Sequence, residues 1–299
     1  MAKGFAQHYL INYNKMTALT THLESFCTLL HIAAVLDWDI QHINVKMVFL
    51  HSILPDSKTV FMEQPTGFEV PGKEDWVMKL MCSIYGMKQA SRIWNQTFHK
   101  SITSLGFQCL PGEWHIYLCH TDSGTCIFAV YVDDIIVISS SPAESICFKT
   151  DLHTKWEISD LSPVKYTLGI LITCDRDMHT LHLSQTTLID RIINQFGQTD
   201  IYLVDTPMVA GYKVTCPDKA LPMPSNIAAW IKRTPYWSLI GSLNYLAITT
   251  YPDILFTVSR LASVLDCYRP EHWDAAICVV CYLKHMQLLT LQLGGINPI

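Results

Sequence analysis

Two adjacent aspartates, Asp133 and Asp134, interrupt what would otherwise be one long apolar strand. Apolar residues at 128–130 precede the pair, and four more at 135–138 follow it. A strand points successive side chains to opposite faces, so a continuous strand would push one carboxylate into the core. Burying a charge is costly unless the chain turns to the surface or a cation meets the charge. The pattern therefore predicts a tight hairpin between two buried strands, with the carboxylates at its tip.

These residues alone leave two explanations for the carboxylate pair open. One is a divalent metal site, because magnesium and calcium prefer oxygen ligands. The other is an ordinary hairpin turn that happens to contain two aspartates. The choice between them depends on the rest of the chain.

Hydrophobic periodicity predicts mixed strands and helices in the first part of the chain and mostly helices in the second. This order indicates an α+β fold with an appended helical part. The expected strands lie at 38–50 (running into a helix start), 60–62, 117–119, 126–139, 165–172 and 180–183. The expected helices lie at 18–36, 87–105, 143–156, 186–196, 236–248, 253–266 and 271–287.

Composition limits the function classes. Apolar residues make up 49% of the 299 residues, which is enough for a sizeable core. The net charge of −5 gives no support for nucleic-acid binding, although a local basic groove stays compatible with it. We find no signal-like or membrane-length apolar segment, so we expect no membrane partner and an intracellular location, cytoplasmic or nuclear. No protein partner is indicated.

Eleven cysteines occur at irregular spacing, and the one CxxC pattern, Cys278 to Cys281, has no second pair at zinc-site spacing. We therefore expect free, reduced thiols.

Several segments resemble, in order, the reverse transcriptases of copia-type retrotransposons. Residues 83–94, SIYGMKQASRIW, are similar to the family pattern SLYGLKQAPRAW, and residues 60–68, VFMEQPTGF, to VYMEQPPGF. Tyr131 to Asp134 has the family's YVDD form. Further matches are AKGFAQ at 2–7, LGI at 168–170, LSQ at 183–185, DTPM at 205–208, SLIGSLNYL at 238–246 and PDI at 252–254.

The resemblance implies a right-hand polymerase fold, with fingers and palm at 1–185 and a helical thumb or connection region at 186–299. It implies template-directed DNA synthesis on an RNA or DNA primer-template from deoxynucleotide triphosphates, with two Mg²⁺ ions. The ribonuclease H segment of full elements is expected to be absent, and the fingers to be truncated.

Site residues carry over by position, each with a plainer alternative. Asp133 and Asp134 would be catalytic metal ligands, and Tyr131 would abut the primer end, or simply pack as a strand aromatic. Phe49 would screen the sugar 2′-position, or be core. The remaining positions are Gln89 beside the incoming base, Lys88 and Arg92 facing phosphate (or forming a solvated basic face), and Leu168 with Gly169 gripping the primer strand (or a plain strand containing a glycine).

One position departs from the family pattern in a way that matters for chemistry. The family strand LDVKNAFLHG reads INVKMVFLHS at 43–52, so Asn44 stands where the third metal-binding aspartate belongs. A unit charge about 4 Å from another is worth roughly 4 kcal/mol at an effective dielectric near 20. That is on the order of a thousandfold in rate. Asp39 does not replace it, because an extended strand puts Asp39 roughly 16 Å from position 44.

Three functions follow as hypotheses: an active polymerase, a degenerate copy that folds without polymerising, and a non-catalytic nucleic-acid-binding or interaction scaffold that keeps the palm. Asn44 and the truncated fingers favour the second.

Overall fold

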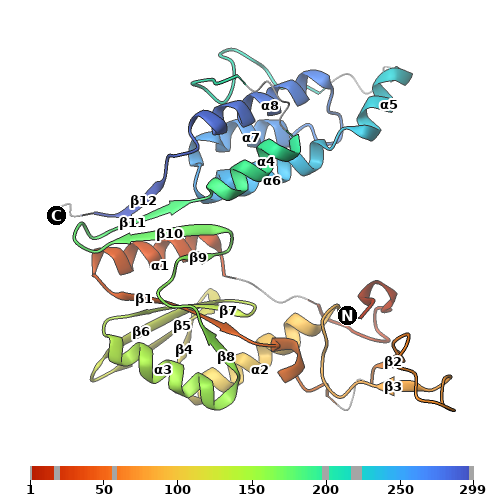
Figure 1. Ribbon diagram of the computed structural model, residues 1–299, viewed down its shortest axis with the longest axis vertical. Coiled ribbons are helices and arrows are strands. Elements are labelled where there is room, and N and C mark those ends of the chain that lie inside the picture. Colours follow the sequence, from red (N-terminus) through yellow and green to blue (C-terminus); the bar gives the residue numbers. More distant parts are fainter. Residues whose placement is uncertain (1, 17–20, 56–58, 197–201, 217–223, 296–299) are drawn as a thin grey trace. The chain divides into compact units, whose positions relative to one another are not determined.

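The structure, a computed structural model, describes residues 2–16, 21–55, 59–196, 202–216 and 224–295 (Figure 1). The chain divides into two compact units, Met1–Val164 and Lys165–Ile299, called unit 1 and unit 2 below. Each unit combines helices with an antiparallel sheet. The expected α+β class is therefore confirmed.

Unit 1 is built on a six-stranded sheet in the order β4-β5-β6-β7-β1-β8. Neighbouring strands in it are antiparallel. The strands are β1 (Asp39–Val45), β4 (Gln108–Leu110), β5 (Glu113–Thr121), β6 (Gly124–Tyr131), β7 (Asp134–Ser139) and β8 (Ile158–Asp160).

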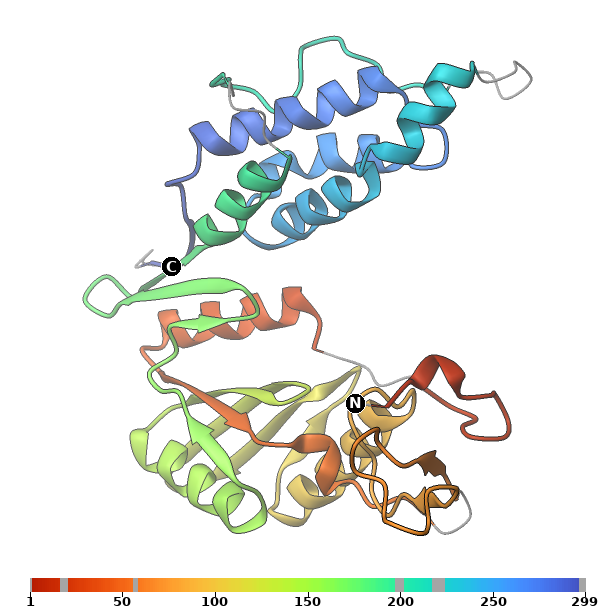
Figure 2. The same cartoon turned by 45° about the vertical axis from the view of Figure 1, so that its right-hand side comes forward.

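Helices cover both faces of this sheet (Figures 1 and 2). Helices α2 (Ala90–Ser104) and α3 (Pro142–Lys155) pack on one face, and α1 (Leu23–Val35) lies on the other. The α2–α3 face forms an aromatic core, in which Trp94 and Phe98 of α2 join Phe128 of β6 and Phe148 of α3. Ile43 and Val45 also point into this core. The alternation of a strand therefore sends His42 and Asn44 to the opposite face.

The predicted hairpin at the aspartate pair is confirmed, and it corrects the single strand expected at 126–139. Strands β6 and β7 pair antiparallel, and the register Tyr131↔Asp134 leaves only Val132 and Asp133 as the loop. The chain thus turns where the charge pattern required it to turn.

Smaller elements complete unit 1. They are the 3-10 helices η1 (Gly4–Ala6) and η2 (Val48–His51), and the two-stranded sheet of β2 (Phe61–Glu63) and β3 (Val77–Lys79).

Unit 2 combines a four-stranded sheet, in the order β12-β11-β10-β9, with a helical core. Its helices bury Tyr236, Leu243, Ile254 and Val280 almost completely. The strands are β9 (Tyr166–Thr167), β10 (Ile170–Asp175), β11 (Thr180–Ser184) and β12 (Leu291–Gly294). The helices are α4 (Thr186–Phe196), α5 (Ser225–Arg233), α6 (Tyr236–Thr249), η3 (Pro252–Ile254), α7 (Leu255–Ala262) and α8 (Pro270–His285).

The division between the units falls earlier than the boundary expected after residue 185. The β10–β11 hairpin was expected to belong to the first part, but β11 also pairs with β12 near the end of the chain. That long-range pairing places the hairpin in unit 2, and no local pattern could show it.

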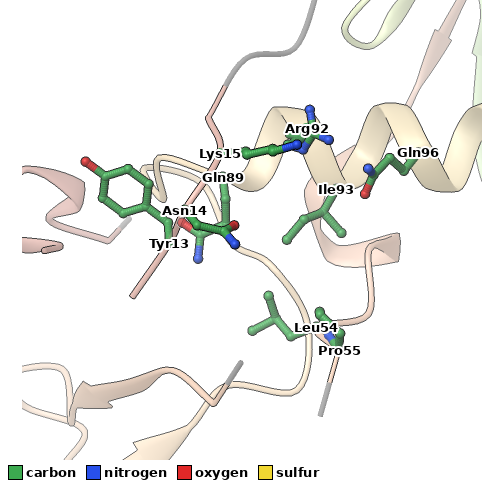
Figure 3. Close-up of a pocket in the computed structure, with 9 residues that line it drawn as sticks. All are labelled: Tyr13, Asn14, Lys15, Leu54, Pro55, Gln89, Arg92, Ile93 and Gln96. Atoms are coloured by element: carbon green, nitrogen blue, oxygen red, sulfur yellow. The ribbon is translucent and has the colours of Figure 1, made fainter. Parts of the chain in front are cut away.

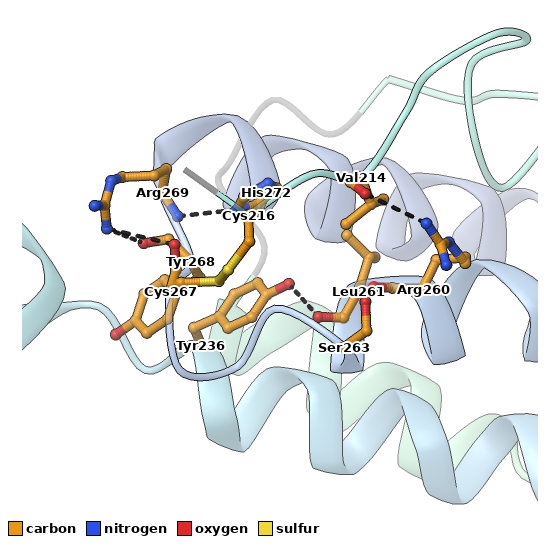
Figure 4. The surroundings of a disulfide bond; sticks show 10 residues. All are labelled: Val214, Cys216, Tyr236, Arg260, Leu261, Ser263, Cys267, Tyr268, Arg269 and His272. Atoms are coloured by element: carbon orange, nitrogen blue, oxygen red, sulfur yellow. Dashed lines mark hydrogen bonds between the residues drawn. A yellow bond between two sulfur atoms is a disulfide. The ribbon is translucent and has the colours of Figure 1, made fainter. Parts of the chain in front are cut away.

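A disulfide corrects the expectation of free thiols. Cys216 and Cys267 are bonded, with their Cα atoms 6.0 Å apart, and the bond ties the irregular segment before α5 to the corner between α7 and α8 (Figure 4). The other nine cysteines are free. Spacing could not reveal the pair, because the two cysteines are 51 residues apart in sequence. Among the described residues, no helix is long and apolar enough to cross a membrane.

Candidate active site

The carboxylate turn sits at the end of the central hairpin and is fixed by two neighbouring elements. The indole Nε1 of Trp94, on α2, donates to the carbonyl oxygen of Val132 at 2.7 Å. The backbone nitrogen of Val45, at the end of β1, donates to the carbonyl oxygen of Asp133 at 2.8 Å. Both loop carbonyls are therefore held, so the turn presents its side chains in a defined position.

Val132 adopts an unusual backbone conformation at this turn. Its φ is +62°, whereas Asp133 is not among the residues with positive φ. A two-residue hairpin loop with positive φ at its first position follows the type II′ pattern, which favours glycine there. A β-branched residue in this region costs on the order of 1–3 kcal/mol. Strain of this kind concentrates at functional sites, which favours a functional turn over an ordinary one.

Asn44 lies directly across the sheet from Asp134, in the β1–β7 register. Its Nδ2 donates to Asp134 Oδ1 at 3.2 Å. The position that resembles the family's third aspartate is thus adjacent to the pair, and its part in metal binding stays a prediction. Asp39 lies at the other end of β1, where its carboxylate accepts from Ser145 at 3.3 Å, so it does not substitute for the missing charge.

His42 is a second partner of Asp134. Its Nε2 lies 2.9 Å from Asp134 Oδ1, and the residue is only 4% exposed. In the register, His42 pairs with Ile136, so its side chain reaches Asp134 diagonally on the same face. The imidazole and the Asn44 amide consequently share one carboxylate oxygen.

These contacts set the acidity of Asp134. The hydrogen bond from His42 lowers the pKa of Asp134, partial burial opposes that effect, and the hydrogen bond from Asn44 lowers the pKa further. The net direction is downward, so the carboxylate is favoured over the acid.

Phe49 and Tyr85 pack against each other. Their rings meet edge to face, with centroids 4.7 Å apart. Burial raises the pKa of the Tyr85 hydroxyl, and the charge of Asp133 raises it further, which places that hydroxyl within electrostatic reach of the turn. Phe49 thus packs against a tyrosine whose pKa responds to the charge of Asp133, and its place beside the sugar stays a prediction. Tyr131, 40% exposed, flanks the turn at the end of β6.

Lys88 and Gln89, at the start of α2, bond instead to the N-terminal segment. The Lys88 ammonium donates to Gln7 O at 3.2 Å and Tyr13 Oη at 3.3 Å, and it lies 5.0 Å from the Tyr13 ring centroid. Gln89 accepts from the Gln7 amide at 3.1 Å and donates to Asn12 O at 3.2 Å. Gln89 is buried, and Lys88 is partly buried.

A cavity of about 240 Å³ opens between this segment and α2 (Figure 3). Gln89 and Arg92 line it from the helix, and Lys15 approaches Arg92 from the N-terminal segment. Two of the predicted nucleotide-binding residues therefore share one cavity with a second cation.

Leu168 and Gly169 belong to unit 2, where they form the turn between β9 and β10. Both have positive φ, +50° and +72°, and the Tyr245 hydroxyl donates to Leu168 O. A Cβ on Gly169 would have only ordinary contacts at 4.0 Å, so backbone conformation rather than space favours glycine there.

The donor set fits magnesium incompletely. Asp133 and Asp134 supply hard oxygen ligands, which suit the ion. Asn44, however, turns its amide nitrogen toward Asp134, and Asp134 Oδ1 already accepts two hydrogen bonds. Across the described ranges, no cluster of three or more His, Cys, Asp or Glu side chains is arranged to hold a metal ion.

Sequence reasoning missed His42 and Tyr85 as members of this site. His42 could have been found, because positions 42 and 44 share a face of one strand. Tyr85 lies inside the SIYGMKQ segment, but the effect of Asp133 on its pKa depends on how the segment between β1 and α2, which contains η2, β2 and β3, folds.

Comparison with known proteins identifies the family. Residues 1–210 match the family described as reverse transcriptase (RNA-dependent DNA polymerase). The chain is 31% identical, over its whole length, to the retrovirus-related Pol polyprotein from transposon TNT 1-94 of Nicotiana tabacum. It is 28% identical over 95% of its length to the Pol polyprotein from transposon RE2 of Arabidopsis thaliana. It is 30% identical, over 83% of its length and 77% of the relative's, to a putative transposon Ty5-1 protein of Saccharomyces cerevisiae.

The match covers 22% of the tobacco polyprotein and 18% of the Arabidopsis one, so the chain corresponds to about a fifth of those proteins. The family match includes the carboxylate turn, Asn44 and the start of α2. The chain belongs to the reverse transcriptase family.

Proposed function

We propose that this chain is the polymerase part of a retrotransposon polyprotein in which nucleotidyl transfer is impaired or lost. The observation that carries the proposal is the pairing of Asn44 with Asp134. An amide occupies the position across the sheet from the carboxylate turn, and it donates a hydrogen bond where a third carboxylate would add charge. Two carboxylates and an amide attract divalent ions less strongly than three carboxylates do.

In this proposal, Asp133 and Asp134 would hold the ion, and the bound ion would supply charge neutralisation and a lowered pKa at the primer hydroxyl. Tyr131 would contact the primer end, and Phe49, backed by Tyr85, would bound the sugar of the incoming nucleotide. Support comes from the fixed turn, whose carbonyls are held by Trp94 and Val45.

The nucleotide part of the proposal uses the cavity of Figure 3. Gln89, Arg92 and Lys15 line this cavity. The two cations, Arg92 and Lys15, supply the positive charge that binding of a triphosphate needs. Lys88 has a more structural place in the proposal, because its ammonium already bonds to Gln7 and Tyr13. Leu168 and Gly169 stay proposed primer contacts on unit 2. A cytoplasmic or nuclear location is part of the same proposal, because primer-templates and nucleotides occur there.

Primer extension on a homopolymer template tests the proposal. We expect the parent to make no more product than a D133N/D134N double variant, and N44D to exceed both. The expected gain is on the order of a thousandfold at most, from the charge restored beside the turn. A parent that makes clearly more product than the double variant, and as much as N44D, would contradict the proposed impairment.

Binding measurements separate impaired polymerase from scaffold. A non-catalytic scaffold would bind primer-template with an affinity that falls steeply as salt rises, and N44D would still make no product. Product from N44D would instead show that the rest of the site is sound.

A further inference from the structure

His42 is a buried polar side chain beside the carboxylate turn, and the family resemblance gives it no role. It lies on the sheet face opposite the aromatic core, 4% exposed, with its Nε2 on Asp134 Oδ1 at 2.9 Å. A buried imidazole with one carboxylate partner has a defined donor, because the carboxylate can only accept. The neutral Nε2–H tautomer and the imidazolium would both donate to Oδ1.

The backbone of His42 is held from the far side of β1. Its carbonyl oxygen accepts from the Leu161 nitrogen at 2.8 Å, and its own nitrogen donates to the Ser162 hydroxyl at 3.2 Å. Ser162 in turn accepts from the Lys149 ammonium at 3.2 Å. The imidazole therefore extends from a strand segment that is held by hydrogen bonds on both edges. It can in turn hold the Asp134 carboxylate in one orientation.

The Asp134 side chain, in contrast, is less firmly held by its own surroundings. It is the first residue after the strained two-residue loop, and its side chain keeps 30% of its exposure. Without a partner, such a carboxylate would sample several rotamers. Two donors reach the same oxygen, Oδ1, so the other oxygen, Oδ2, is the one directed to any cation unless a donor is displaced.

We propose that His42 is a positioning residue for the polymerase site, which clamps Asp134 through Oδ1 and presents Oδ2 as the metal-binding oxygen. This inference rests on the proposed function, because it assigns Asp134 the ligand role stated there. The short contact from a nearly fully buried imidazole supports it, because outer-shell hydrogen bonds of this kind orient the carboxylates that bind metal ions.

The test compares His42→Leu with His42→Gln in the full chain. Leucine fills the space without a donor, whereas the glutamine amide can still donate to Oδ1. Outer-shell partners of metal ligands typically change metal affinity by about 10- to 100-fold. We expect H42L to weaken Mn²⁺ binding, measured by water-proton relaxation, by that factor, and H42Q to stay within about threefold of the parent.

His115→Leu is the matched control. His115 is equally buried, 4% exposed, and lies in the same sheet, but its Nε2 meets the Asn95 amide at 2.8 Å rather than a carboxylate. If loss of any buried histidine weakened Mn²⁺ binding, both leucine variants would be affected. Because His115 does not contact Asp134, we expect H115L to bind Mn²⁺ like the parent.

A second readout needs neither metal nor folding of H42L. In ¹⁵N-histidine spectra, the imidazole Nε2–H resonance removed by H42Q should also move in D134N. An unmoved resonance would overturn the inference. So would H42L binding Mn²⁺ as tightly as the parent or more tightly, or H42Q failing to restore binding.

Failure of the proposed function looks different. If neither the parent nor N44D binds Mn²⁺, the ligand role of Asp134 is wrong, and the positioning role falls with it. If only N44D binds Mn²⁺, the same comparison of H42L with H42Q is made in the N44D background, with the same expected factors. If Mn²⁺ binds and only the H42L effect is missing, the role of His42 alone is wrong.

Discussion

At the residue scale, the site depends on which side chains meet Asp134. The sequence pattern identified the carboxylate pair, because two charges between apolar runs have few acceptable solutions. It also identified Asn44 by position. It could not identify the shared oxygen, because the approach of His42 and Asn44 to Oδ1 depends on the β1–β7 register, which pairs residues far apart in the chain. The sequence thus identifies residue types at the site, but not which atoms meet.

Asn44→Asp should lower the stability of the metal-free protein and raise its affinity for Mg²⁺. The variant loses the donor to Asp134 and places a like charge across the sheet from it, so we expect the metal-free protein to lose about 1–3 kcal/mol. Mg²⁺ should restore that loss and stabilise N44D more than the parent. Thermal unfolding with and without Mg²⁺ measures both effects.

Asn44→Ala serves as its control, because it removes the donor without adding a charge. We expect N44A to be destabilised less than N44D without metal and to gain little from Mg²⁺. Equal responses of N44A and N44D to the ion would contradict the role given to position 44.

At the element scale, long periodic segments were predicted well and short ones were not. The expected helices at 87–105 and 143–156 correspond to α2 and α3, and the latter begins where the Ser141 hydroxyl accepts from the Glu144 nitrogen at 3.4 Å. Of the strands of three or four residues, only β2 had been expected, at 60–62. Strands β3, β4, β8 and β12 were missed, because so few residues carry little readable period. Helix α5 was also missed. Of its residues, only Trp230 and Ile231 pack against the hydrophobic core of unit 2.

The contact between α3 and the β5–β6 turn predicts a pH dependence of stability. The Glu144 carboxylate accepts from the Ser123 hydroxyl and from Thr121 Oγ1, the latter at 2.7 Å. The bond from Ser123, followed by that from Thr121, lowers the pKa of Glu144. A carboxyl whose pKa is lower in the folded state stabilises the fold above its ordinary pKa of about 4.3, and that contribution disappears as the pH falls through the folded pKa.

Glu144→Gln should therefore be less stable than the parent by about 0.5–1 kcal/mol at pH 6, and the difference should shrink toward pH 3. Urea unfolding of the two proteins across this range measures it. The exposed Glu69→Gln serves as the control, for which we expect little difference at pH 6. A gap between E144Q and parent that stays constant down to pH 3 would show that the charge is not what the hydroxyls stabilise.

At the scale of the whole molecule, long-range ties define the units. The β11–β12 pairing and the Cys216–Cys267 bond both lie within unit 2, and both join segments that are distant in sequence. Around the disulfide, Arg260 donates to Val214 O at 3.4 Å, which adds a second tie between the irregular segment and α7 (Figure 4). Assignment of the units as palm and thumb stays a prediction from the family resemblance.

Cys216→Ser tests how far unit 2 depends on its cross-link. Closing a loop of 51 residues removes unfolded-state entropy worth about 4 kcal/mol in the chain-entropy model. We therefore expect C216S to unfold at a clearly lower urea concentration than the parent under non-reducing conditions, and a reductant to bring the parent down to the level of C216S. Cys147→Ser removes an exposed free thiol, so it should leave the urea concentration of unfolding unchanged, with or without the reductant. If C216S unfolded at the same urea concentration as C147S, the helical core of unit 2 would be stable without the bond, and the packing of Tyr236, Leu243 and Val280 would be sufficient to hold it.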